Sequence, residues 1–188
     1  AIERGLTAAL SKAATVPAVL ALAQRWEVEA GILADALHVL RCVTSIAPES
    51  TDEFLRANGL PVLLRAMSSQ AASSPIGEPA TLSMESSMEQ ACELGSEQAG
   101  GARLAVEILA SGCSLLWSAS LRQAAWHETL LNPSAAPLAP LLARLAADEM
   151  HASAPLQLGL HGLLWSLSLR PLWARALYAD GWIVRLAA

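Results

Sequence analysis

Four histidines are the side chains of this 188-residue chain best suited to metal binding or proton transfer, and their spacing supports neither role. His151 and His161 are ten residues apart, which does not place them on one face of a helix. The pair His127 and Glu128 lacks the second histidine of an HExxH zinc motif. We therefore expect isolated core or surface histidines, without a bound metal or cofactor, at His38, His127, His151 and His161.

Nucleophilic catalysis has no stronger basis in the sequence. The three cysteines, Cys42, Cys92 and Cys113, have no paired spacing, so they form neither a disulfide framework nor a CxxC motif. No GxSxG, GxGxxG or P-loop string occurs, and no serine, histidine and acid can be nominated as a triad. We expect a protein that is not an enzyme and that works in a reducing compartment, the cytoplasm, with cytoskeletal or ciliary association as a further possibility.

The charge distribution argues against nucleic acid as a partner. The basic residues are eleven arginines and one lysine, scattered along a chain whose net charge is −5. Residues 68–100 carry no basic residue and five glutamates, which are Glu78, Glu85, Glu89, Glu93 and Glu97. This acidic stretch is rich in Ser, Ala and Gly, so most of it cannot bury enough surface to become ordered. Its second half still has the composition of a helix, with Ser83 as N-cap.

The remaining composition indicates an all-α fold. Hydrophobic residues make up 54% of the chain, enough for one domain with a sizeable core, and most of them are Leu and Ala, which favour helices. The longest charge-free run, residues 152–169, contains Pro155, Gln157 and His161. We interpret this run as a buried helix and expect no membrane span.

An internal copy shows how these helices are arranged. The octamer LLWSASLR at residues 115–122 returns as LLWSLSLR at residues 163–170. Near-identical apolar segments at this separation are typical of stacked helical units, because each unit buries its apolar face against the next one.

A second repeated element gives the register of the units. VPAVL at residues 16–20, LPVLL at 60–64, APLLA at 139–143 and WIVRL at 182–186 recur at 44, 79 and 43 residues. Two of these steps agree with a repeat of roughly 40 to 47 residues, and the acidic stretch accounts for the excess in the third. The sequence therefore predicts one domain over residues 1–188, with repeats at 1–46, 47–120, 121–168 and a partial one at 169–188. Residues 68–100 are predicted to be an insertion in the second repeat.

Each predicted repeat has two short helices and one long helix. The strings LRANG (55–59) and LYADG (177–181) indicate that the first short helix ends at Asn or Asp followed by a glycine with positive φ. The long helix of the first repeat is predicted to begin at Glu27. Its buried face is expected to comprise Val28, Ile32, Ala36, Leu40 and Val43. Pro155 and Pro171 fall near predicted helix starts.

The succession of a helix, Asn/Asp-Gly, L-P-x-L-L and a long helix ending in L-W-x-x-S resembles the armadillo repeat family. A HEAT-like solenoid is the structural alternative, because LLNPSAAP (131–137, with the preceding leucine) replaces the glycine junction in the third unit. The resemblance implies a right-handed superhelical solenoid whose long helices line a concave groove for partners.

The resemblance also implies which residues line that groove. Trp117 and Trp165 match the groove tryptophan of the family, and Cys42 stands there in the first repeat. The asparagine that holds an extended peptide in the nuclear-import branch is replaced by Ile46, Leu121 and Leu169. An apolar helix or peptide is therefore a more natural partner than a basic import signal. The alternative for both tryptophans is packing between repeats, which is also the expected role of Trp126 and Trp173.

Arg122 and Arg170 are equivalent in the two octamers. They either bind carboxylates of a partner or interact with the carbonyl ends of the preceding helices. A further possibility is that the acidic stretch of the same chain folds back over the groove and binds them.

The expected function is a non-catalytic protein-interaction scaffold or structural subunit that binds a partner helix or peptide in the groove. One alternative is a regulatory armadillo domain of a larger catalytic or motor protein, and another is an RNA-binding helical repeat. The chain begins with Ala1 and its fourth repeat is cut short, so we expect a piece of a longer protein, with a continuation or capping chain beyond Ala188.

Overall fold

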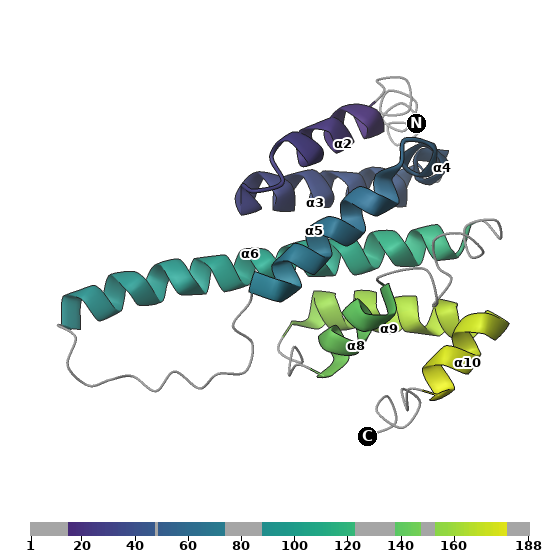
Figure 1. Cartoon of the computed structure of the whole chain (residues 1–188). Coiled ribbons are helices and arrows are strands. Elements are labelled where there is room, and N and C mark those ends of the chain that lie inside the picture. Colours follow the sequence, from purple (N-terminus) through teal and green to yellow (C-terminus); the bar gives the residue numbers. More distant parts are fainter. Residues whose placement is uncertain (1–14, 48, 74–87, 123–137, 148–152, 180–188) are drawn as a thin grey trace.

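The computed structural model describes residues 15–47, 49–73, 88–122, 138–147 and 153–179 (Figure 1). These residues form eight helices and no strand, which confirms the predicted all-α class. In chain order the helices are α2 (Thr15–Arg25), α3 (Ala30–Ile46), α4 (Glu49–Arg56), α5 (Gly59–Ser73), α6 (Met88–Ser120), α8 (Leu138–Ala147), α9 (Ala154–Ser168) and α10 (Pro171–Ala179).

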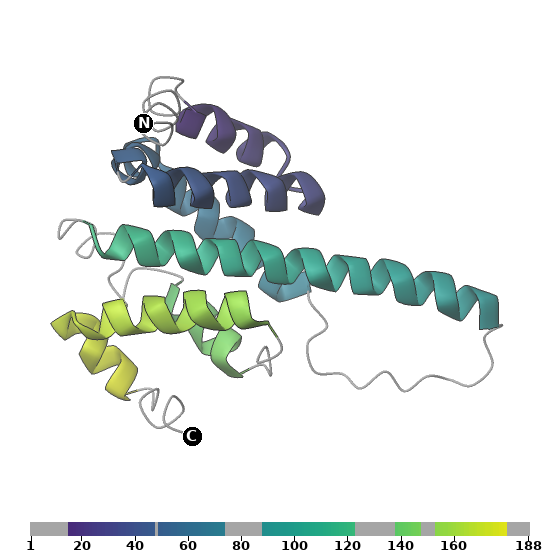
Figure 2. The same ribbon diagram turned by 180° about the vertical axis from the view of Figure 1, so that it is seen from behind.

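Three long helices, α3, α6 and α9, lie side by side and run in the same direction, with α6 in the middle (Figures 1 and 2). The shorter α5 packs on α6 and α8 packs on α5. The core between these helices consists mainly of leucines, and its largest fully buried side chains include Trp173 and Phe54. The predicted burial of Trp173 is therefore correct, whereas Trp126 lies outside the described residues.

The repeated elements take equivalent places in these helices. The two octamer copies bring α6 and α9 to an end at Ser120 and Ser168, and α3 ends at Ile46. These are the residues at which the sequence analysis places the ends of its first three repeats. The VPAVL-type elements open α2, α5 and α8, while the fourth such element lies outside the described residues. Pro155 and Pro171 are at the starts of α9 and α10, as predicted.

The predicted buried face of the first long helix is wrong in its first half. The chain turns at residues 26–29, so α3 begins at Ala30 and Val28 is 94% exposed in the turn. Ile32 is also exposed, because the first turn of α3 buries Leu33 instead. The second half of the prediction holds, since Ala36, Leu40 and Val43 are buried.

The junction between α4 and α5 also differs from the expectation. The residue with positive φ is Asn58, at 62°, and Gly59 is already the first residue of α5. Gly59 is required by packing, because a Cβ there would overlap the ring of Phe54. The corresponding Asp180 and Gly181 lie outside the described residues.

Parts of the acidic stretch, residues 68–100, are helical. Residues 68–73 complete α5, and residues 88–100 form the first part of α6 without a break from the long helix. The described parts of residues 68–100 therefore lengthen two helices, and Ser83 lies outside the described residues. The predicted helix in the second half of the stretch is present from Met88 onward.

The continuity of α6 sets the distance along the helix between the acidic stretch and the arginines. Glu97 and Arg122 are 25 residues apart on or just beyond one helix, which corresponds to roughly 37 Å along the axis. Arg170 lies at the same end as Arg122, because Ser120 and Ser166 share a buried hydrogen bond.

Within the described residues, one helical stretch, Gly100–Ser120, is long and apolar enough to cross a membrane. It lies between α3 and α9 in the core, and 56% of its most apolar 18-residue window is buried. Core helices of soluble proteins have the same length and composition, so this stretch is weak evidence for a membrane span.

Candidate functional site

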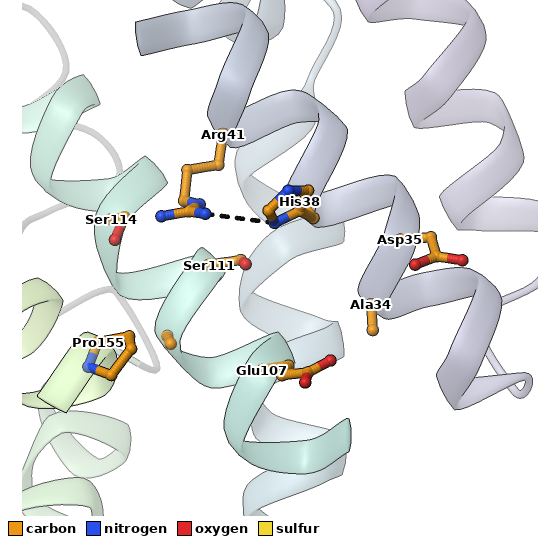
Figure 3. A pocket seen from close by; sticks show the side chains of 9 residues that line it. Ala34, Asp35, His38, Arg41, Glu107, Ser111, Ser114 and Pro155 are labelled. Carbon is orange, nitrogen blue, oxygen red and sulfur yellow. Dashed lines mark hydrogen bonds between the residues drawn. The ribbon is translucent and has the colours of Figure 1, made fainter. Parts of the chain in front are cut away.

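A cleft of about 390 Å³ opens between α3 and α6, with the start of α9 at one side (Figure 3). Both long helices contribute polar side chains to it. The lining residues are Ala34, Asp35, His38 and Arg41 of α3, Glu107, Ala110, Ser111 and Ser114 of α6, and Pro155 of α9.

The α3 wall places Asp35, His38 and Arg41 on one face, because residues three apart are neighbours on a helix. Arg41 Nη2 donates to His38 Nδ1 at 3.2 Å, and His38 Nε2 lies 3.6 Å from the sulfur of Cys42. A guanidinium can only donate, so Nδ1 carries the lone pair and the neutral imidazole has its hydrogen on Nε2. Both ring nitrogens are therefore engaged within α3.

The α6 wall presents Glu107, Ser111 and Ser114 at intervals of four and three residues. Glu107 accepts a hydrogen bond from Arg103 Nε at 3.0 Å, in an exposed ion pair one turn apart. Ser114 lies across the cleft from Arg41, and Glu107 lies toward the end that contains Asp35 (Figure 3).

The cleft therefore has a cationic end at Arg41 and an anionic end at Asp35 and Glu107. Six residues separate Asp35 from Arg41, which is about 9 Å along the axis of α3. Arg41 Nε is buried and has no hydrogen-bond partner among the described residues. A guanidinium with unused donors beside two serine hydroxyls can bind a carboxylate, and the opposite end can bind an ammonium or guanidinium group.

None of the groove residues predicted from the sequence lines this cleft. Trp117 is half-buried, and its indole lies against Gly162 of α9, where a Cβ would overlap it. Trp117 is therefore part of the contact between α6 and α9. Its counterpart Trp165 is 58% exposed.

The other predicted positions are near helix ends. Ile46, Leu121 and Leu169 are exposed at the ends of α3, α6 and α9. Arg122 is exposed, whereas Arg170 is partly buried and its Nε has no hydrogen-bond partner among the described residues. Cys42 is partly buried beside His38.

Cys113 and Gly159 make a second close contact between α6 and α9. Full burial raises the pKa of the Cys113 thiol to about 12, because the thiolate would lose its hydration. Among the described residues, no three His, Cys, Asp or Glu side chains come together as a metal site.

Sequence reasoning missed the lining residues of the cleft. A usable signal is present, because Asp35, His38 and Arg41 share one face of a predicted helix and so do Glu107, Ser111 and Ser114. Their pairing across two helices depends on the register between α3 and α6, which the long acidic stretch obscures.

No family model matches this chain, and no curated protein or solved structure matches it.

Proposed function

We propose that this chain is a non-catalytic protein-interaction module of the armadillo type that binds a segment of a partner protein in the cleft between α3 and α6. The cleft itself carries the proposal, because it is open, formed by three helices and charged oppositely at its two ends. The arrangement is suited to binding, since the side chain most able to move protons, His38, is already engaged by Arg41 and Cys42.

The repeat pattern supports the armadillo assignment. Three parallel long helices end at Ile46, Ser120 and Ser168, and each follows a shorter helix that opens with a VPAVL-type element. In such an array the long helices form the concave side, which is where the cleft would lie. A regulatory armadillo domain of a larger catalytic or motor protein could use the same cleft to bind its partner.

The charges of the cleft define the partner segment. It carries an acidic side chain for Arg41, Ser111 and Ser114, and a basic side chain for Asp35 and Glu107. Asp35 and Arg41 are about 9 Å apart along the axis of α3, a spacing that matches side chains six positions apart along a helix or three apart in an extended peptide. RNA fits less well, because its phosphates would meet the carboxylates of Asp35 and Glu107.

The experiment selects, from a displayed library of random peptides, those that bind the intact chain, and then measures the affinity of each enriched peptide by titration. We expect enriched peptides to combine one acid and one base, and Arg41→Glu to weaken their binding at least about tenfold, the effect of losing one charge-assisted contact. Replacing the acid of the peptide with lysine should restore binding to Arg41→Glu. The matched control is Arg175→Glu on the exposed side of α10, which should bind like the parent chain.

Circular dichroism and thermal unfolding establish that each variant is folded. Enrichment of peptides that bind Arg41→Glu as well as the parent chain would place the binding site elsewhere. Salt-dependent binding of an RNA oligonucleotide, abolished by Arg41→Glu, would instead support the nucleic-acid alternative.

A further inference from the structure

The outer face of α9 carries exposed apolar side chains. Helix α6 has a long helix on each side, whereas α9 has one only on the side of α6 (Figures 1 and 2). Leu158, Trp165 and Leu169 are 67%, 58% and 61% exposed, and His161 lies exposed among them. These four residues, which we call the end stripe, recur at three and four residues and so share one face of α9.

The internal copy shows what covers such a stripe. Leu158, His161 and Trp165 lie 48 residues after Ala110, Cys113 and Trp117 of α6. On α6, these residues lie in the contact with α9, where Cys113 meets Gly159 and Trp117 meets Gly162. The face of α6 that is buried by a long helix therefore has its counterpart in the end stripe, which is left uncovered.

The end stripe is also close to symmetric about Trp165. His161 precedes Trp165 by four residues and Leu169 follows it by four, while Leu158 precedes it by seven and Leu172 of α10 follows it by seven. In an antiparallel pair of such stripes, Trp165 lies on the two-fold axis, Leu158 of one copy meets Leu172 of the other, and His161 meets Leu169. The stripe contains no Asp, Glu, Lys or Arg, and its one histidine faces a leucine of the second copy, so like charges do not oppose the pairing.

We infer that the end stripe binds the end stripe of a second copy of this chain, giving a two-fold dimer through α9. The four exposed apolar side chains, Leu172 at 56% included, offer roughly 500 Å² per copy, so a pair buries about 1,000 Å², the lower limit for a specific interface. A patch of about 500 Å² is in the range of the largest apolar patch on a typical monomer, and such patches are often binding sites. Two-fold pairing is the most frequent way for identical chains to cover one.

The test is analytical ultracentrifugation of the intact chain over a wide concentration range. We expect a monomer–dimer equilibrium, which Trp165→Glu shifts toward monomer by at least about tenfold in Kd, because a charge enters an apolar interface. The matched control is Leu22→Glu on α2, which is 44% exposed at the opposite end of the molecule and should dimerise like the parent chain. Both sites are exposed, so thermal unfolding should show intact folding for each variant.

A disulfide trap tests the two-fold arrangement itself. Trp165→Cys should link to the same position in a second copy, because only a two-fold axis brings identical residues together. Peptide mapping separates this link from links through the native cysteines. Three results would each overturn the inference: a parent chain that stays monomeric, association that survives Trp165→Glu, and association lost equally with Leu22→Glu. Since the end stripe lies outside the cleft, peptide binding by Trp165→Glu should be unchanged, so this proposal can fail without the proposed function failing.

Discussion

Cys113 illustrates what complete burial does to a single reactive group. Its thiol has a pKa of about 12 in the folded chain, against an ordinary value of 9.0. Below about pH 9 the thiol is protonated in both the folded and the unfolded chain, so it contributes no pH dependence. Between about pH 9 and pH 12 the unfolded chain releases the proton and the folded chain does not.

We therefore predict that the free energy of unfolding falls as pH rises above 9, by about 1.4 kcal/mol per pH unit from this group. Urea unfolding across this range, compared with Cys113→Ala, measures the contribution of the thiol. The slope should be smaller in the variant, and equal slopes would mean that Cys113 is not its source. In the folded chain an alkylating reagent should modify Cys42, which is partly exposed, and leave Cys113 unmodified.

At the scale of helices, substitutions at two glycines distinguish the effect of side-chain packing on stability from the effect of helix propensity. A Cβ at Gly162 would overlap the indole of Trp117, whereas a Cβ at Gly101 would meet nothing within 4 Å. We predict that Gly162→Ala lowers the free energy of unfolding by about 1–3 kcal/mol, because the contact between α6 and α9 becomes overpacked. Gly101→Ala, the control in an exposed part of α6, should raise it by up to about 1 kcal/mol. Denaturant unfolding compares the two, and a stabilising Gly162→Ala would show that Trp117 can move aside at little cost.

The sequence predicted best those elements that are encoded locally. The octamer copies marked the ends of α6 and α9, and Pro155 and Pro171 marked the starts of α9 and α10. The face of α3 was predicted only from Ala36 onward, because apolar periodicity runs on through Val28 although the chain turns before Ala30. Gly59 was predicted to be needed for a positive φ. It is needed instead because the ring of Phe54 packs against it, which the local sequence does not encode.

The candidate site was predicted less well than the fold. The equivalent tryptophans Trp117 and Trp165 have different environments, because Trp117 has a neighbouring helix and Trp165 has none on its outer side. Nothing in the octamer itself encodes this difference. The cleft depends on which residues of α3 and α6 face each other, and these lie more than 70 residues apart in the sequence.

At the scale of the whole molecule, α6 has two unequal parts. The later part of α6 packs among α3, α5 and α9, while its first part extends beyond the other helices (Figure 2). Gly100, Gly101, Ala102 and Arg103 are all exposed. A helical extension without tertiary support is marginally stable in water.

We predict that amides before residue 101 exchange with solvent much faster than those of Leu109 or Leu116 in the same helix. Hydrogen exchange followed by mass spectrometry measures both regions in one sample. Leu109 and Leu116 are fully buried, so their exchange should approach the rate of global unfolding. Equal protection along α6 would instead show that a second chain or another segment supports the extension.

The parallel course of α3, α6 and α9 has an electrostatic consequence for the molecule as a whole. Each helix carries a macrodipole with partial negative charge at its C-terminus, and the three C-termini at Ile46, Ser120 and Ser168 lie at one end of the molecule (Figure 1). Parallel dipoles add, so that end forms a negative pole beyond what the formal charges supply. Arg122 and Arg170, two residues past the ends of α6 and α9, partly neutralise this pole. The helix backbones therefore add to the field that a charged partner meets close to this end of the molecule.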